Sequence, residues 1–249
     1  MQDERSHEIV YEAPEAELVP DLMQELASQY NAAGNIDPII KGAMIHLNLA
    51  MIHPFKDGNG RMARALQTLA ISRHGILSPV FSSIEEWLGR NTVGYYKILG
   101  DVGKRKWNPD HGALPWIKFC LTAHYQQAAT LLKRTKELEL VWNAISETIA
   151  HEDVPTRCEI ALANAAFGLR VRNSSYRADN DISEVVASRD LKKLCDLELL
   201  QPVGEKRGRY YLAAPKLRQI REKFRERKRA PNPYDIIRQK DQPSFPGFS

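Results

Sequence analysis

Apolar residues recur every three or four positions through most of the first 135 residues, which is the spacing of one face of an α-helix. The pattern predicts a helix that begins near Pro20 and carries Leu22, Leu26 and Tyr30 on one face. Within this part of the chain, only residues 9–12 have the character of a short strand. The periodicity therefore predicts a mainly α fold.

Signals at helix ends predict where the following helices begin and stop. Asp37 and Pro38 predict an N-cap followed by a proline in the first turn, and the apolar helix after them is expected to end near Ile52. Another helix is expected from about Gly60 to Gly75. Further helices are expected at 83–89, 91–101, 113–134, 138–151 and 156–167.

The C-terminal part of the chain has a different organisation. Residues 170–180 are polar and predict a loop, and residues 203–212 predict a β-hairpin with a basic tip. Between them, residues 181–200 predict a helix whose inward residues are Val185, Leu191, Leu194 and Leu197. A helix followed by a basic hairpin is the pattern of winged-helix DNA-binding modules. We therefore expect a helical domain in residues 1–135, a small α+β winged helix in residues 136–215 and a basic, flexible tail in residues 216–249.

Charge and cysteine content restrict the class of protein. The net charge of +4 is local, because residues 204–240 hold 13 Lys and Arg against 4 Asp and Glu. This asymmetry predicts a surface for an acidic partner. Cys120, Cys158 and Cys195 are widely separated and form no C-x-x-C pair, which favours buried, reduced thiols over a disulfide framework or a zinc site.

The sequence gives no sign of export or of a membrane partner. No apolar run approaches the roughly 20 residues that span a bilayer. The N-terminus is charged and lacks the apolar core of a signal peptide. We therefore expect a cytoplasmic location.

Residues 53–64, H-P-F-K-D-G-N-G-R-M-A-R, lie between two predicted helices and contain more special residues than packing alone would require. Gly58 and Gly60 allow a sharp turn and a close approach of the backbone to a ligand. The N–H groups of this turn open onto the first turn of the next helix, where the helix dipole attracts anions. Arg61 and Arg64 are three positions apart and can reach the same anion. The stretch therefore predicts a phosphate site.

The same stretch also holds groups for chemistry at the edge of that site. Asn59 adds an amide donor, and Asp57 has the right charge for Mg²⁺, which binds through one or two carboxylates plus substrate phosphates. A neutral imidazole at His53 could take a proton from an attacking hydroxyl. Each residue alone has a structural explanation as a buried histidine, a turn or a solvated helix face, and Phe55 is expected to anchor the loop in the core in either case. The combination favours a ligand site, because each structural explanation accounts for one residue only.

At every fixed position these residues match H-x-F-x-(D/E)-G-N-G-R-x-x-R, the signature of the Fic (filamentation induced by cAMP) family. The helix before the stretch, the run from Tyr11 to Met23 and the segment R-N-T-V-G-Y-Y from Arg90 also resemble Fic sequences. The resemblance covers most of residues 9–135. The C-terminal part resembles Fic proteins with an appended winged helix.

The resemblance implies a protein adenylyltransferase, which moves AMP from ATP to a Thr, Ser or Tyr hydroxyl of a target protein and releases pyrophosphate. It gives His53 the role of general base and Asp57 that of holding Mg²⁺ between the α- and β-phosphates. It implies phosphate contacts from Gly58, Asn59, Gly60, Arg61 and Arg64, with the γ-phosphate at Arg64. It also suggests an adenine pocket at Tyr95 and Tyr96, for which core packing is an equally good explanation.

Two family features have no clear counterpart in this sequence. Fic proteins dock their targets by β-strand addition to a hairpin called the flap, and Ile9, Val10 and Tyr11 could belong to its second strand, with little room for the first. The self-inhibitory motif S/T-x-x-x-E-G/N is missing, because no Glu is followed by Gly or Asn. Three alternatives stay open: a separate antitoxin-like inhibitory protein, an unrestrained enzyme, or a missing N-terminal piece.

Other functions remain as alternatives to AMP transfer. One is a DNA-binding regulator with a nucleotide-sensing Fic domain, whose DNA contacts would be Ser188, Arg189, Lys192 and Lys193 on the predicted helix and Lys206, Arg207 and Arg209 on the wing. The other is a Fic enzyme that uses a different donor or removes AMP. The Gly-Asn-Gly form of the loop favours AMP transfer.

Overall fold

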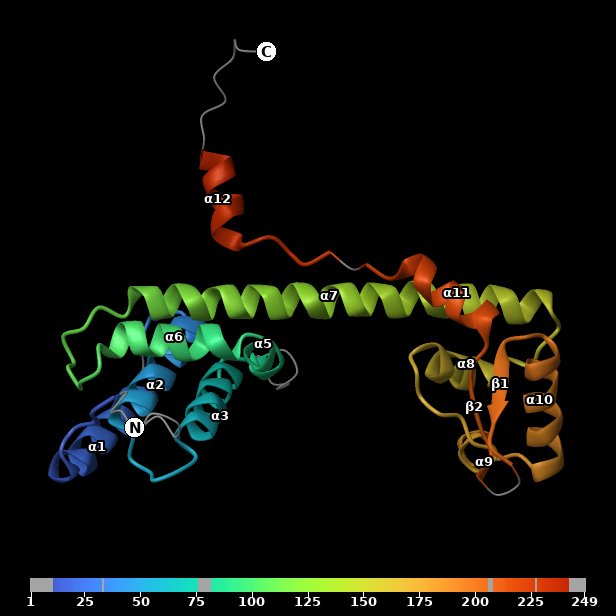
Figure 1. The fold of residues 1–249 in the computed structure, drawn as a ribbon, viewed down its shortest axis with the longest axis horizontal. Helices are drawn as coiled ribbons and strands as arrows, with labels where there is room; N and C mark the ends of the chain where they lie inside the picture. Colours follow the sequence, from blue (N-terminus) through green and yellow to red (C-terminus); the bar gives the residue numbers. More distant parts are fainter. Residues whose placement is uncertain (1–10, 33, 76–81, 206–207, 227, 242–249) are drawn as a thin grey trace, which may run out of the picture. The chain divides into compact units, whose positions relative to one another are not determined.

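The computed structural model describes residues 11–32, 34–75, 82–205, 208–226 and 228–241, and within these ranges the chain is mainly helical (Figure 1). The predicted mainly α fold is thereby confirmed. The chain divides into two compact units, one with residues 1–131 and 230–249 and the other with residues 132–229. The three domain limits expected from the sequence stay a prediction.

The first unit consists of helices. Its described elements are η1 (Ala16–Leu18), α1 (Val19–Asn31), α2 (Pro38–Ile52), α3 (Asn59–Ser72), α5 (Glu85–Arg90), α6 (Thr92–Gly103), the first part of α7 (Leu114–His151), and α12 (Pro233–Asp241). The predicted cap of α2 is confirmed, because the Asp37 side chain accepts the N–H groups of Ile39 and Ile40 at 2.9 and 3.4 Å. Helix α2 ends at Ile52 and α3 begins at Asn59, so the loop that carries the signature connects two long helices.

Helix α2 is held by apolar contacts on two sides. On one side it packs with α1 and α3, where Leu26, Leu49 and Ala63 are buried. Glycine at position 42 allows a close approach to α3, since a Cβ there would lie 3.1 Å from a side-chain carbon of Ile71. On the other side it packs with α6 and α7, where the fully buried Trp116 donates its indole N–H to the Ala43 carbonyl at 2.7 Å. Both ends of the signature loop therefore rest on a well-packed core.

The second unit is an α+β structure with a small antiparallel sheet. Its elements are the rest of α7, η2 (Thr156–Cys158), α8 (Glu159–Ala166), α9 (Asn173–Asn180), α10 (Glu184–Asp196), β1 (Leu200–Val203), β2 (Tyr210–Ala213) and α11 (Pro215–Phe224). The predicted hairpin is present, with Leu200 opposite Ala213 and Val203 opposite Tyr210. Val171 pairs with Tyr211 on the other edge of β2. The winged-helix assignment of this arrangement stays a prediction.

Three predicted features of the second half are wrong. The helices expected at 113–134 and 138–151 are one helix, α7, because neither Gly nor Pro stands between Pro115 and Pro155 to end it. The loop expected at 170–180 contains α9, which is anchored by Tyr176 with 2% of its surface exposed. Val185 was expected to face inward but is 78% exposed, because the buried stripe of α10 runs through Ala187, Leu191 and Leu194 instead.

The tail is also more ordered than its composition suggests. Residues 216–249 were expected to be flexible, yet α11 packs on the core of the second unit through the buried Leu217. Arg221 on α11 donates to Glu137 at 2.9 Å and stacks over the Phe167 ring. Helix α12 forms within the same expected tail, and residues 242–249 lie outside the described residues. The apolar residues of 217–224 are spaced three and four positions apart, as on one face of a helix. This pattern therefore predicts the structure of the segment better than its high charge does.

The remaining composition-based expectations concern thiols and membranes. All three cysteines are free, and Cys120 and Cys158 are buried while Cys195 is half-buried. No helix in the described ranges combines the length and the hydropathy of a bilayer-spanning segment. The cytoplasmic location stays a prediction from the sequence.

Candidate active site

His53 closes helix α2 in a left-handed conformation, with φ 55° and ψ 51°. Its backbone N–H still donates to the Leu49 carbonyl at 3.1 Å, while its ring Nδ1 lies 3.3 Å from the Ala50 carbonyl. Because a carbonyl can only accept, this contact favours the tautomer with the proton on Nδ1. The Nε2 atom of the half-buried ring is then left as an acceptor.

The loop after His53 is held together by the Asn59 side chain. Its Oδ1 accepts the Phe55 N–H at 3.0 Å, and its Nδ2 donates to the Phe55 carbonyl at 2.5 Å. Asn59 is only 4% exposed, whereas the Phe55 side chain is 44% exposed. The expectation that Phe55 anchors the loop in the core is therefore wrong, because its peptide groups rather than its ring are fixed. The phosphate contact expected from Asn59 stays a prediction.

Helix α3 presents its N-terminus to the loop. Gly58 is the N-cap with φ 88°, a conformation that a side chain would strain. The N–H groups of the first helical turn have no carbonyl one turn earlier to bind, and the helix dipole adds positive potential there. The end of α3 is therefore suited to an anion, as the glycine pattern predicts.

Asp57 and Arg61 form an exposed ion pair beside this helix end. Their side chains are 90% and 71% exposed and meet at 2.9 Å, and the other Asp57 oxygen accepts the Gly58 N–H at 2.6 Å. An exposed pair of this kind contributes about 0–1 kcal/mol, so a ligand can replace it at little cost. The described residues contain no group of three or more His, Cys, Asp or Glu that could hold a metal by themselves. Asp57 therefore fits Mg²⁺ only together with oxygen ligands from a nucleotide.

Arg64 lies one turn further along α3 and is already engaged. Its Nε donates to Glu85 of α5 at 2.5 Å, and its guanidinium lies near the Tyr95 hydroxyl of α6 beside Gly60. The Arg64 side chain is 22% exposed and Glu85 is 55% exposed. Glu85 does not fit the self-inhibitory motif, because Glu86 and not Gly or Asn follows it. No sequence pattern indicates that residues 64 and 85 lie close together. An anion at Arg64 has to compete with this carboxylate.

One cavity of about 460 Å³ lies beside the signature loop, and neither Arg61 nor Arg64 lines it. Of the residues singled out in the sequence, it is lined by His53, Asp57, Gly58, Asn59, Gly60, Tyr95, Tyr96 and Tyr11. The Tyr95 ring is 4% exposed and the Tyr96 ring 57%, and the two centroids lie 5.2 Å apart. The His53 imidazole and the N-terminus of α3 thus share one cavity with two aromatic rings.

Residues 2–71 match the family model described as Fic/DOC family. The N-terminal part of this chain is therefore similar to the Fic/DOC family. The chain is 30% identical over 78 residues to a probable protein adenylyltransferase of Aquifex aeolicus (strain VF5), covering 31% of this chain and 24% of that protein. It is 48% identical over 70 residues to protein adenylyltransferase fic-1 of Caenorhabditis elegans, covering 27% of this chain and 13% of that protein. The chain thus spans less than a quarter of the length of these relatives.

A solved structure is similar over a longer stretch. A Fic family protein from Desulfovibrio desulfuricans G20 aligns with 82% of this chain and 57% of its own, at 22% identity and a TM-score of 0.43. The similarity to the Fic/DOC family is carried by the sequence match in residues 2–71 and by the relatives above.

Tyr11 is the described member of the expected docking strand of the Fic domain, and Ile9 and Val10 lie outside the described residues. The Tyr11 hydroxyl donates to the Met51 carbonyl at 2.9 Å, and burial raises the pKa of this tyrosine to about 12. Its neighbour Glu12 pairs with residues 105–107 through two backbone hydrogen bonds of 2.8 and 2.9 Å. Tyr11 therefore holds the end of α2 beside the cavity, and target docking stays a prediction.

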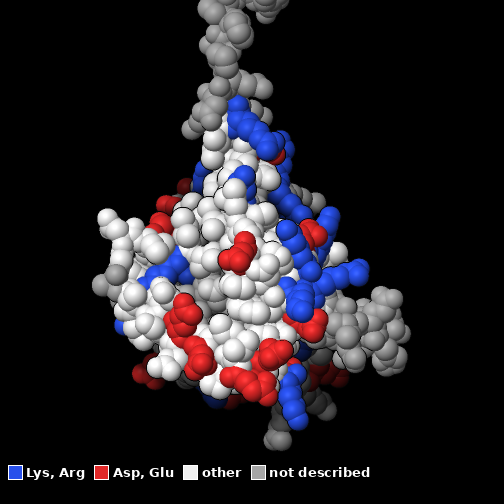
Figure 2. All heavy atoms as spheres, turned by 90° about the vertical axis from the view of Figure 1, so that its left-hand side faces the viewer, with Lys and Arg blue, Asp and Glu red and all other residues white. Residues whose placement is uncertain are grey.

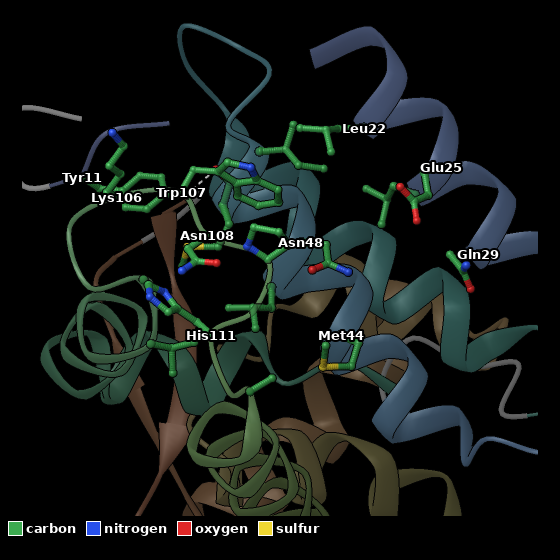
Figure 3. A pocket seen from close by; sticks show the side chains of 18 residues that line it. Tyr11, Leu22, Glu25, Gln29, Met44, Asn48, Lys106, Trp107, Asn108 and His111 are labelled. Atoms are coloured by element: carbon green, nitrogen blue, oxygen red, sulfur yellow. Dashed lines mark hydrogen bonds between the residues drawn. The ribbon is translucent and has the colours of Figure 1, made fainter. Parts of the chain in front are cut away.

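A second cavity of the first unit, about 310 Å³, shares Tyr11 and Met51 with the first cavity. Figure 3 shows that its polar groups come from α1, α2 and residues 106–111, among them Glu25, Asn48 and His111. None of the signature residues lines it. The signature residues that line either cavity, among them His53 and Asp57, therefore line only the first.

The expected DNA contacts in the second unit are only partly available. Arg189 and Lys192 are exposed on α10, whereas Lys193 donates to the Asp153 carbonyl at 2.5 Å and Ser188 accepts from Asn173 at 3.1 Å. Arg209 is also exposed, and Lys206 and Arg207 lie outside the described residues. The side of the first unit that Figure 2 shows carries both basic and acidic side chains around an uncharged area.

Proposed function

We propose that this chain transfers AMP from ATP to a hydroxyl side chain of a target protein. The hydroxyl oxygen forms a bond to the α-phosphorus, the bond between the α-phosphorus and the bridging oxygen breaks, and pyrophosphate leaves. The carrying observation is that His53 and the first residues of α3 line the same cavity. The names of the relatives, protein adenylyltransferases, support the same activity.

The residues divide the work between proton transfer and charge. His53 takes the proton of the attacking hydroxyl on Nε2, a role that typically contributes about 10²–10⁴-fold to the rate. The first turn of α3, with Arg61 and Arg64, binds the phosphates and stabilises charge that develops during transfer. Mg²⁺ held by Asp57 and the phosphates would neutralise further negative charge on the leaving group. ATP and Mg²⁺ are thus the proposed co-substrate and cofactor.

Glu85 gives this proposal a built-in competitor. A γ-phosphate at Arg64 has to displace the Glu85 carboxylate, which lies 2.5 Å from the Arg64 Nε. Displacement is feasible because Glu85 is more than half exposed and can turn into solvent. An antitoxin-like inhibitory protein is a separate proposal, because such a protein would need its own binding surface on this chain.

Labelled ATP tests the proposed transfer directly. We incubate the protein with Mg²⁺, cell lysate and ATP carrying its label in either the α- or the γ-phosphate. AMP transfer labels protein from the α-position only, whereas phosphate transfer labels from the γ-position. Absence of protein-bound label from both nucleotides, including on the chain itself, contradicts the proposal.

A second candidate function is DNA binding by the second unit. It is favoured by the exposed Arg189 and Lys192 on α10, which precedes the β1–β2 hairpin. Replacing both by alanine should weaken duplex binding and reduce the slope of log K against log salt by about 2, roughly 0.9 for each lost phosphate contact. Arg90→Ala with Lys97→Ala in the first unit is the matched control. Binding with no salt dependence, or no binding at 50 mM salt, rejects this role.

A further inference from the structure

A chain of hydrogen-bonded side chains runs through the core of the Fic domain toward Arg64. It begins at His124 of α7, whose Nε2 lies 3.0 Å from the Gln67 Nε2 of α3. The Gln67 Oε1 lies 2.6 Å from the Nδ1 of His46 on α2, which is fully buried. The Nε2 of His46 lies 3.0 Å from the Tyr95 hydroxyl of α6. Four helices thus contribute one residue each.

The positions of the protons along this chain follow from its first member. The amide nitrogen of Gln67 can only donate, so the Nε2 of His124 accepts and the Gln67 oxygen is left to accept from His46. Burial lowers the pKa values of His46 and His124 to about 4, so both rings are neutral near pH 7. With its one proton on Nδ1, His46 offers Nε2 as an acceptor. The Tyr95 hydroxyl must therefore donate inward to His46.

This direction leaves the Tyr95 oxygen with lone pairs only on its other side, and the Arg64 guanidinium lies near this hydroxyl. The two groups come together over Gly60, since a Cβ at that position would lie 3.2 Å from the Arg64 Nη1 and 3.9 Å from the Tyr95 hydroxyl oxygen. Burial raises the pKa of Tyr95 to about 12, so its hydroxyl stays protonated and can donate a hydrogen bond to His46. Glycine at 60 leaves room for the guanidinium to fold back over the first turn of α3.

We propose that His46 and Gln67 orient the Tyr95 hydroxyl as a fixed acceptor that positions Arg64 for the terminal phosphate of the nucleotide. The inference rests on the proposed function, because it assigns that phosphate to Arg64. Glu85 holds the Nε edge of the guanidinium and is replaced by the incoming phosphate, whereas Tyr95 holds another part and stays in place. Tyr95, His46 and Gln67 are positioning residues, since they act through Arg64.

The burial of the chain argues that it has such a purpose. His46, Gln67 and Tyr95 are 0%, 1% and 4% exposed. Apolar residues of similar shape would fill these positions without a desolvation cost. The hydrogen-bonded network therefore fixes the direction of the Tyr95 hydroxyl and adds no extra stability. The near-complete burial of Tyr95 also leaves little of its ring for the adenine contact expected from the sequence.

Tyr95→Phe tests the contact with the smallest change in packing. We expect its affinity for ATP to fall by about tenfold, the effect of one hydrogen bond to a charged group, while its affinity for ADP changes less than twofold. In the labelling assay, the KM for ATP should rise by a similar factor with kcat little changed, because Arg64 holds the phosphate before and during transfer alike. Tyr125→Phe on α7, which removes an exposed hydroxyl, is the matched control.

The coupling along the chain needs a second variant. His46→Leu should also weaken ATP binding, and the double variant with Tyr95→Phe should bind within twofold of Tyr95→Phe alone, because both changes remove the same contact. A thermal melt reports whether His46→Leu is folded, and Tyr95→Phe decides the inference in either case.

The outcomes separate this inference from the proposed function. Tyr95→Phe with wild-type affinity for ATP overturns the inference, as does a wild-type protein that binds ATP no better than ADP. If the wild type transfers no AMP but prefers ATP, and Tyr95→Phe loses that preference, the transfer proposal fails and the positioning of Arg64 stands.

Discussion

Replacing His53 should reduce AMP transfer by about 10²–10⁴-fold, the range for removal of a positioned general base. His53→Asn is the better variant, because asparagine tolerates the left-handed conformation that position 53 adopts, with φ 55°. Affinity for ATP should stay within about threefold, since the proposed phosphate contacts lie on α3 and not on the imidazole. The measurement is the initial rate of label transfer from the α-phosphate, together with ATP binding by calorimetry.

His151→Ala provides the control, because it removes an exposed histidine at the end of α7. Its transfer rate should equal that of the wild type. If His53→Asn keeps more than a tenth of the wild-type rate, His53 is not the base. A large loss of ATP affinity in His53→Asn would instead point to a role in binding.

The local backbone structure of the site could be predicted because the site lies in twelve consecutive residues. Glycine at 58, the capped helix end and the arginines on α3 follow from backbone rules that act within one turn. The hydrogen bonds of Asn59 to Phe55 also act within the loop, yet the sequence does not show that the amide rather than the aromatic ring fixes it.

The partners of Arg64 could not be predicted, because they come from elements far away in the chain. Glu85 and Tyr95 approach it from α5 and α6, and their positions depend on how those helices pack. The direction of the Tyr95 hydroxyl depends in turn on His46, 49 residues away. Sequence patterns predict which face of a helix is buried, but not which buried polar groups meet.

The fold was predictable where apolar periodicity was strong and the ends were marked. Helix α2 has both signals, and its limits agree with the expectation. Helix α9 has neither, since one buried tyrosine among polar residues gives no period, and its structure depends on tertiary contacts of Tyr176. Helix α7 shows the opposite case, in which the absence of a helix breaker outweighs a weak point in the apolar pattern.

Tyr176 also belongs to the polar cluster whose loss should have the largest effect on stability. Asp190 has a side chain that is 4% exposed, and it accepts from Arg157 at 2.7 and 3.0 Å and from the Tyr176 hydroxyl at 3.1 Å. Arg157→Met should destabilise the second unit by about 3 kcal/mol, because it leaves a buried carboxylate without its charge partner. Hydrogen exchange of α8, α9 and α10 in the full chain measures this change without assuming that the two units unfold together.

The pH dependence of this loss provides a second check. Burial alone would raise the pKa of Asp190, but the hydrogen bonds from Arg157 and Tyr176 outweigh it and hold the pKa below the ordinary value. A carboxyl with a lowered folded-state pKa stabilises the protein above its unfolded-state pKa of about 3.9, and this contribution is lost as the pH falls through the folded-state pKa. The difference between the wild type and Arg157→Met should therefore be largest near pH 7 and should shrink below about pH 4.

Arg177→Met is the matched control for this prediction, because it removes an arginine from an exposed pair. Arg177 and Glu184 meet at 3.2 Å with 43% and 75% of their side chains exposed. An exposed pair contributes about 0–1 kcal/mol, so this variant should exchange nearly as slowly as the wild type. Equal losses in the two variants, or a loss in Arg157→Met that does not change with pH, would show that the Asp190 cluster holds the second unit by packing rather than by charge.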